Sequence, residues 1–369
     1  MMTSASSLSS LVEAVGSSQR RCALCGVAAS LRCRGCLDAM YCSKEHQKAD
    51  RRRHRPACAP LEEAVDRAVE RGRRMQWPVD ARAKSPCWVC LSDEGELYRG
   101  LCGCRGDAGV AHVDCWVAQA WARVDAFDAF DACPICKQPF LNGVVTMELK
   151  YSLWKKRRRE GGHPTATSRL GFVLRAVDRD AALRLLRKAV VDDAGSVVDD
   201  ESGKIRRIHA VTSDAQRYAD VLGETRPDDA VALLRTVLET ARAAFEDDDV
   251  RVMQIRRSLA RALLNTNGGK KQNHRAATDE YRDLVQRCTR LHGPNDFSTL
   301  VSTFDLARSL IVQDHLHEAI ALLTPFVKTA TRILGPDHGI TTTAASLLDN
   351  ANNDLLTRPH HCSTGGGNT

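Results

Sequence analysis

The sequence predicts a multidomain protein in which two small cross-braced modules, α+β with little regular structure, precede an all-α domain of helical repeats. Three observations predict this order. Thirteen of the 15 cysteines lie between Cys22 and Cys136, in two clusters that also contain histidines. Beyond residue 165 the chain has long helical periodicity and repeats itself at spacings of 42 and 47 residues. Aromatic residues make up only 5% of the chain, which favours helical packing over a sandwich or barrel.

Length and charge narrow the class of protein. A chain of 369 residues allows two or three domains. The net charge of +7 is a mild bias, because 46 acidic residues accompany 53 basic ones. Basic residues form two runs, Arg51 to Arg55 and Lys155 to Arg159, but no aromatic residues alternate with them. Solvated helix faces are therefore the preferred interpretation of both runs, and nucleic acid is not expected as a partner.

The N-terminus and the hydropathy pattern bear on the compartment. Met1-Met2-Thr3-Ser4 begins no basic region and no long apolar region, so a secretory signal is not expected. No stretch of about 18 apolar residues occurs, so no membrane span is expected either. An intracellular protein, cytoplasmic or nuclear, follows as an expectation. In a reducing compartment the clustered cysteines are interpreted as metal ligands and not as disulfide partners.

Composition also divides the chain into segments. In order, we expect a Ser-rich, disordered or partly helical N-terminus (1–20), a first cysteine module (21–59), a helical linker (60–84), a second cysteine module (85–142), a basic helix with a helical connector (143–204), helical repeats (205–357) and a disordered tail (358–369).

The first cluster contains eight donors, in the order Cys22-x2-Cys25-x7-Cys33-x2-Cys36, then Cys42-x3-His46 and His54-x3-Cys58. With its phrase Tyr41-Cys-Ser-Lys-Glu and its closing His-x3-Cys, this segment resembles a MYND finger. The resemblance implies two Zn2+ ions, one held by Cys22, Cys25, Cys42 and His46 and the other by Cys33, Cys36, His54 and Cys58. It departs from the family at His46, where cysteine is usual, but imidazole also binds zinc well.

The resemblance to MYND fingers also implies a role. Such a finger recognises short, often Pro-rich peptides, and no sign of an accompanying SET domain is visible. The first module is therefore expected to bind a protein or peptide partner.

The second cluster also holds eight donors, which suffice for two tetrahedral Zn2+ ions with no open coordination position. They follow the order Cys87-x2-Cys90-x11-Cys102-x1-Cys104-x7-His112-x2-Cys115-x17-Cys133-x2-Cys136. This order and spacing resemble the RING-CH domain. A PHD finger shares the ligand order but usually differs in the gaps around the fourth ligand. The RING-type resemblance implies a cross-brace, with Cys87, Cys90, His112 and Cys115 on one ion and Cys102, Cys104, Cys133 and Cys136 on the other.

The RING-CH resemblance implies an E3 ubiquitin ligase, which docks a ubiquitin-charged E2 and has no catalytic residue of its own. Catalysis is then a matter of orientation. Positions that match the family's E2 contacts are Val89, Pro134 and either Trp116 or Trp121, and Lys137 lies where RING ligases often carry a ubiquitin-contacting basic residue. Core packing is an equal alternative for either tryptophan. Two other functions stay open: a non-enzymatic scaffold, and a PHD-like chromatin reader, which would need an aromatic cage.

The repeats are visible when the chain is aligned with itself. Leu291 to Asn295 matches Ile333 to Asp337 at an offset of 42, and Leu259-Ala260 matches Leu306-Ala307 at an offset of 47. The extra five residues fit an insertion at 267–271. Each unit is interpreted as two antiparallel helices, and stacked pairs make a solenoid. The phrase at 334–342 resembles the tetratricopeptide repeats of kinesin light chains, with three units between about 205 and 356. An ordinary helical bundle is the alternative.

Overall fold

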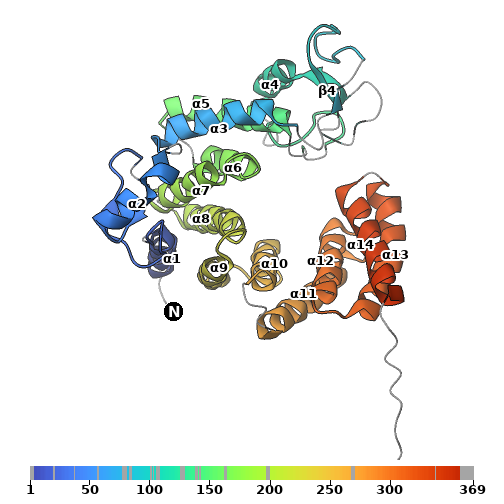
Figure 1. Ribbon diagram of the computed structural model, residues 1–369. Coiled ribbons are helices and arrows are strands. Elements are labelled where there is room, and N and C mark those ends of the chain that lie inside the picture. The colour runs from blue at the N-terminus through green and yellow to red at the C-terminus, as the bar shows by residue number, and fades with distance from the viewer. Residues whose placement is uncertain are drawn as a thin grey trace, which may run out of the picture. The chain divides into compact units, whose positions relative to one another are not determined.

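The computed structural model divides into two compact units, Met1–Thr225 with Leu233–Ala244 and Arg226–Ala232 with Phe245–Thr369 (Figure 1). The structure describes residues 4–19, 21–36, 38–55, 58–76, 81–82, 85–99, 102, 104, 109–124, 129–137, 140, 143–161, 164–196, 200–266, 271–336 and 338–357.

The first zinc module is a two-stranded hairpin followed by one helix. Strand β1 (Leu31–Arg32) pairs antiparallel with β2 (Met40–Tyr41), with Leu31 opposite Tyr41. Helix α2 (Lys44–His54) begins where the Ser43 hydroxyl accepts a hydrogen bond from the backbone N–H of His46, an N-cap that satisfies one of the free donors of the first turn. Tyr41 is completely buried, and its hydroxyl donates to Asp50 of α2 at 2.9 Å. This bond ties the helix to the hairpin.

The second zinc module consists of a small antiparallel sheet and one helix. The sheet contains β3 (Ala81–Arg82), β4 (Leu97–Arg99) and β5 (Ala111–His112), with β4 in the centre. Helix α4 (Val113–Ala122) follows directly on β5. Its Trp116 is 1% exposed and packs edge-on against Trp88 and Phe140, with ring centroids 5.6 and 5.4 Å apart. These three rings form an apolar centre in the module.

Six further helices of the first unit pack against one another (Figure 1). Amphipathic α3 buries Val65, Ala68 and Val69, and its Gly72 lies so close to Met147 of α5 that an added Cβ would collide with the sulfur. Helix α7 contacts α1, α3, α6 and α8. The helices are α1 (Ser4–Gln19), α3 (Leu61–Arg74), α5 (Val144–Arg159), α6 (Pro164–Leu174), α7 (Arg179–Ala194) and α8 (Glu201–Leu222).

Charged side chains attach the first zinc module to α7. Arg184 and Arg187 of α7 both pair with Asp38, which lies between the two strands of the hairpin. Arg184 also donates to the backbone carbonyl of Cys36, 3.3 Å away, and is 9% exposed. A buried arginine needs such partners, because an unpaired charge in this position would be costly. We call this set the α7 clamp.

A second set of charges attaches the second zinc module to α5 and α6. Lys150 of α5 is 5% exposed and donates to the Phe130 carbonyl at 2.5 Å and to the Asp131 carboxylate. Arg169 of α6 approaches the other oxygen of Asp131 at 2.6 Å. Asp131 precedes the ligand Cys133 by two residues. We call this set the α5 clamp.

The second unit contains helices in sequential antiparallel contact. Helix α11 packs on α10 and on α12, and α13 packs on α12 and on α14. Leu300, Phe304, Leu323 and Phe326 belong to one buried cluster between these helices. The bounds are α10 (Val250–Leu264), α11 (Lys271–His292), α12 (Phe297–Val312), α13 (Leu316–Leu334) and α14 (Gly339–Thr357), and α9 (Pro227–Arg242) has residues in both units.

The expected fold class is confirmed: a zinc-binding region with few strands precedes an all-α region of helix pairs. Of the two alternatives expected for the N-terminus, disordered or partly helical, residues 4–19 form a helix, α1. Leu8, Leu11 and Val15 of this helix are buried, and α1 contacts α7 and α8. The remaining domain boundaries stay predictions. The tail at 358–369 and residues 267–270 of the expected insertion lie outside the described residues.

Two carboxylates of α7 and α8 produce a testable pH dependence. Burial, and then the charge of Asp214, raise the pKa of Asp193 to about 7. The folded chain therefore binds a proton that the unfolded chain releases near pH 4, so stability from this pair falls as pH rises from about 4 to 7. Asp193→Asn keeps the neutral form at every pH. We expect the free energy of unfolding of this variant, relative to that of wild type, to increase by on the order of 1–2 kcal/mol as the pH is raised from 5 to 8. Denaturant unfolding measures it.

A difference in free energy of unfolding between the two proteins that stays the same at every pH would contradict this account. Protonation of the zinc ligands affects both proteins equally, so the difference between them reports on Asp193 alone.

Candidate metal centres

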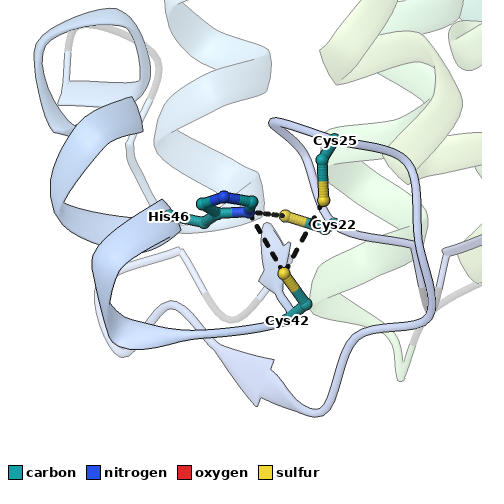
Figure 2. A group of neighbouring side chains, drawn as sticks. All are labelled: Cys22, Cys25, Cys42 and His46. Atoms are coloured by element: carbon teal, nitrogen blue, oxygen red, sulfur yellow. Dashed lines mark hydrogen bonds between the residues drawn. The ribbon is translucent and has the colours of Figure 1, made fainter.

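The first centre lies between the Cys22 knuckle and helix α2 (Figure 2). Cys22 and Cys25 come from one tight turn, Cys42 follows β2, and His46 projects from the first turns of α2. The Cys22 Sγ and His46 Nδ1 atoms lie 3.6 Å apart, the Cys25 and Cys42 sulfurs 3.6 Å, and the Cys42 Sγ and His46 Nδ1 atoms 3.1 Å. Hairpin, knuckle and helix thus meet at one point.

These separations can be tested against zinc. Zn–S bonds of about 2.3 Å and Zn–N bonds of about 2.0–2.1 Å in a tetrahedron place neighbouring donor atoms roughly 3.5–3.8 Å apart. The four donor atoms of the first centre lie within 4.8 Å of one another, and two of the three separations above equal 3.6 Å. The donor set is three thiolates and one imidazole, so it fits a structural zinc ion, and His46 serves where a cysteine is usual.

The second centre of this module joins the hairpin to the end of α2. It is formed by Cys33, Cys36, His54 and Cys58. The Cys33 and Cys58 sulfurs are 3.6 Å apart, and the His54 Nε2 atom lies 3.6 Å from the Cys36 sulfur. His46 and His54 are both on α2, so the helix is held by one zinc site near each end.

The third centre lies between the Cys87 knuckle, β5 and α4, and its donors are Cys87, Cys90, His112 and Cys115. His112 Nδ1 is 3.4 Å from the Cys90 sulfur and 3.6 Å from that of Cys115. Its other ring nitrogen, Nε2, donates to the Glu94 carbonyl at 2.6 Å. That bond fixes the tautomer in which Nδ1 is free to bind metal, a support common around zinc-bound histidines.

The fourth centre consists of thiolates alone. Cys102, Cys104, Cys133 and Cys136 lie with their sulfurs within 4.8 Å of one another, and those of Cys104 and Cys133 are 3.6 Å apart. In both modules the first and third donor pairs share one centre and the second and fourth share the other. These are the four groupings that the family resemblances imply, and each site is closed, as expected for structural zinc.

Three of the four Cys-x2-Cys knuckles share one backbone geometry. The residue after the second cysteine has a left-handed φ, 72° at Gly26 and 62° at both Leu91 and Lys137. In each case its N–H bonds to the carbonyl of the first cysteine, at 2.8 to 3.0 Å. Backbone N–H groups also point at sulfur, as from Val89 to Cys87 at 3.4 Å. Such bonds stabilise the thiolate that metal binding requires.

The same bonds influence ionisation of the first cysteine in three knuckles. Burial opposes ionisation of Cys22, but backbone N–H groups outweigh it and lower the pKa to about 5. The same balance lowers the pKa of Cys33 and of Cys87 to about 6. These thiols therefore lose their protons readily when a metal ion binds.

The five positions predicted to contact an E2 have different surroundings. Val89 is 36% exposed, Lys137 is exposed and Pro134 is half-buried. Trp116 lies in the apolar centre of the module and is not available to a partner, so the core alternative is right for it. Trp121 is half-buried, with its ring against Phe130 and under the Lys156 ammonium.

Sequence reasoning missed several residues that support the centres. Asp38, Asp131 and Lys150 form the two clamps, and Glu94 orients His112 through its backbone, where side-chain identity carries no signal. Ile135, directly before Cys136, is 47% exposed and has the same place in its knuckle as Val89. That equivalence was readable from the two Cys-x2-Cys motifs.

Comparison with known proteins supports the first module most directly. Residues 22–58 match the MYND finger family. The E3 ubiquitin-protein ligase LAP of Rabbit fibroma virus (strain Kasza) is 30% identical over 74 residues, 20% of this chain and 34% of the viral protein. The chain thus matches about a third of the length of that curated relative.

Solved structures that match part of this chain include a putative kinesin light chain from Podosopora anserina with nearly identical TPR-like repeats. It is 17% identical, with a TM-score of 0.37, over 57% of this chain and 86% of that one. BtubC (BKLC) from P. vanneervenii is 13% identical, with a TM-score of 0.35, over 60% of this chain and 96% of that one.

None of the helices in the described ranges is long and apolar enough to cross a membrane. A MYND finger beside helix pairs suggests a zinc-dependent protein-interaction module.

Proposed function

We propose that this chain is a ubiquitin-protein ligase of the RING-CH type, in which the second module recruits a ubiquitin-charged E2. The MYND finger and the helix pairs would hold the substrate. The observation that carries the proposal is the cross-brace of the second module: Cys87, Cys90, His112 and Cys115 interleave with four cysteines of a second closed site. Such a module offers no open metal position for chemistry, so its contribution is to bind and orient.

The surface of the second module supports an E2-binding role. The described residues include three exposed large apolar side chains on this module, and all belong to or follow a knuckle: Val89 at 36%, Leu91 at 79% and Ile135 at 47% exposed. Exposed aliphatic side chains on rigid zinc knuckles are suited to contact a protein. Lys137, next to the last ligand, is exposed as well and would face ubiquitin.

The similarity to the viral E3 ubiquitin-protein ligase favours this function over a plain scaffold. The PHD-like reader receives less support, because five of the module's described aromatic rings pack against one another. Trp88 and Phe140 pack on Trp116, and Trp121 packs on Phe130. An aromatic cage for methyl-lysine needs rings that face solvent.

Ubiquitination in a purified system tests the proposal. The full chain with E1, a panel of E2s, ubiquitin and ATP is expected to form ubiquitin chains. Ile135→Glu places a charge on the proposed apolar contact and should lower the rate by at least about tenfold, because central apolar contacts dominate interface energy. Its zinc content and melting temperature should stay unchanged, since Ile135 is 47% exposed.

Val312→Glu is the matched control. Val312 is 55% exposed at the end of α12, outside the zinc modules, and its substitution should leave the rate unchanged. A folded, zinc-loaded wild type that forms no chains with any E2 would favour the scaffold.

A further inference from the structure

Helix α2 of the MYND finger carries five basic residues on one face. Lys44, Lys48, Arg51, Arg52 and Arg55 follow the spacing i, i+4, i+7, i+8, i+11, which places them along a single stripe of an α-helix. All five are exposed. The zinc ligands His46 and His54 and the buried Asp50 project from other faces of the helix. We call these five residues the α2 stripe.

Among the described residues, no carboxylate forms an ion pair with the α2 stripe. Within the part of the chain that the structure describes, no ion pair or side-chain hydrogen bond involves any of the five. The two acidic residues of α2 have other partners: the buried Asp50 carboxylate accepts from Tyr41 and Arg53, and the Glu45 carboxylate accepts hydrogen bonds at the helix N-terminus, with Lys48 contributing only through its charge. Most of the positive charge of the stripe is therefore available to an external anion.

The second basic run of the chain differs in this respect. On α5, the Lys155 ammonium lies over the Tyr151 ring at 4.8 Å and that of Lys156 over the Trp121 ring at 4.3 Å. Arg157 pairs with Glu160 at 3.1 Å, and Arg158 pairs with Glu62. These cations serve the fold. The two basic runs, which look alike in sequence, thus have different surroundings in the structure.

Helix stability does not account for the α2 stripe. Basic residues favour the C-terminal end of a helix, which covers Arg51, Arg52 and Arg55, but Lys44 lies in the first turn, where a positive charge opposes the macrodipole. Like charges at i, i+4 also repel each other, and the stripe contains three such pairs: 44 with 48, 48 with 52, and 51 with 55. The repulsion among these charges weakens the isolated helix, and a bound polyanion would reduce that repulsion.

Charge density indicates which polyanion. From Lys44 to Arg55 the stripe extends about 16 Å and carries five charges, about one per 3 Å. An extended acidic peptide offers at most about one charge per 6.6 Å on the side that faces the stripe, because its side chains alternate, whereas each strand of a nucleic-acid duplex offers one phosphate per about 3.4 Å. No large apolar or aromatic side chain is exposed on α2. Neither membrane insertion nor base stacking is thus favoured.

We propose that the α2 stripe binds the phosphodiester backbone of a nucleic-acid duplex without reading its sequence. Nine basic side chains face three acidic ones in residues 21–58. The two Cys3His zinc sites, each with a net charge of −1, leave the finger clearly positive. Arginine suits this role, because its guanidinium group pairs with phosphate through two hydrogen bonds. The proposal departs from the sequence-based expectation that this run is only a solvated face.

Fluorescence anisotropy with labelled 20-base-pair duplexes of mixed sequence, one of DNA and one of RNA, tests the proposal on the full chain. We expect micromolar affinity at low salt and a linear fall of log K with log salt. Lys48→Gln/Arg52→Gln should weaken binding by about tenfold and reduce the salt slope by about 2, one for each lost phosphate contact. A preference for one duplex identifies the physiological source, and equal binding identifies a general backbone contact.

Arg67→Gln/Arg74→Gln provides a control with the same change of charge. Both arginines are exposed on α3 of the same unit and pair with Glu63 and Glu70. This variant should keep the wild-type affinity and slope, and both variants should retain four zinc ions and the wild-type melting temperature. Equal losses in the two variants, or no duplex binding at 50 mM salt, would overturn the proposal. So would polyglutamate binding that depends on Lys48 and Arg52 while both duplexes fail to bind.

Discussion

Removal of zinc is expected to unfold both zinc modules while the helices of the second unit keep their structure. The buried cluster of the first module consists of Tyr41 and three ligand cysteines, with few other apolar side chains packed on it. Such a core cannot hold the chain alone, and structural zinc contributes about 10–16 kcal/mol per site in small modules. The second unit has its own apolar cluster and, among its described residues, only one cysteine, Cys288.

Hydrogen exchange with mass spectrometry, before and after addition of a strong chelator, measures this effect segment by segment. Protection should disappear in residues 21–55 and 85–124 and persist in α10 to α14. Metal analysis of the untreated protein should give four zinc ions per chain. A value near two would show that one module has been misinterpreted, and retained protection in both modules after complete zinc loss would contradict the stability argument.

Breaking the α5 clamp is expected to produce the second large effect. Asp131→Ala leaves the Lys150 ammonium buried beside Arg169 without its carboxylate. Loss of one member of a buried pair costs about 3–5 kcal/mol, and we expect about 2–4 kcal/mol here because the Asp131 side chain is 36% exposed. Burial already lowers the pKa of Lys150, and the nearby Asp131 charge opposes that shift. Denaturant unfolding measures the loss.

Two variants separate charge from packing in this test. Asp131→Ala/Lys150→Met removes both charges and should recover much of the stability. Glu63→Ala breaks the exposed ion pair with Arg67, with side chains 53% and 45% exposed, and should cost less than about 1 kcal/mol. If the double variant is no more stable than Asp131→Ala, the buried ammonium is not the cause.

The zinc centres could be predicted from sequence because their geometry is local. A Cys-x2-Cys turn brings two sulfurs together wherever it occurs, and spacing such as His54-x3-Cys58 completes the donor sets. The helix pairs were visible as repeats for a similar reason, since each buried helix face leaves an apolar period. Trp116 was ambiguous because a tryptophan after the sixth ligand has the same spacing whether it faces the core or a partner.

Long-range pairing was not predictable. Asp38 and Arg187 are 149 residues apart, and nothing near either one indicates the other. The same limit applies to the basic runs: only the fold shows that Arg158 pairs with Glu62 while no described carboxylate forms an ion pair with the α2 stripe. The N-terminus was left open between disorder and partial helix because Leu8, Leu11 and Val15 are few, and the serines around them resemble the composition of a disordered segment.

The two clamps affect the distance between proteins that bind to the two zinc modules. Two binding sites joined by a flexible chain meet at an effective concentration that depends on chain length. Here the α7 clamp and the α5 clamp fasten the modules to helices that pack on one another, because α3 contacts α5 and α7. A protein bound at one module is therefore presented to the other at a set distance. Which lysines come within reach would depend on geometry and not on the length of a linker.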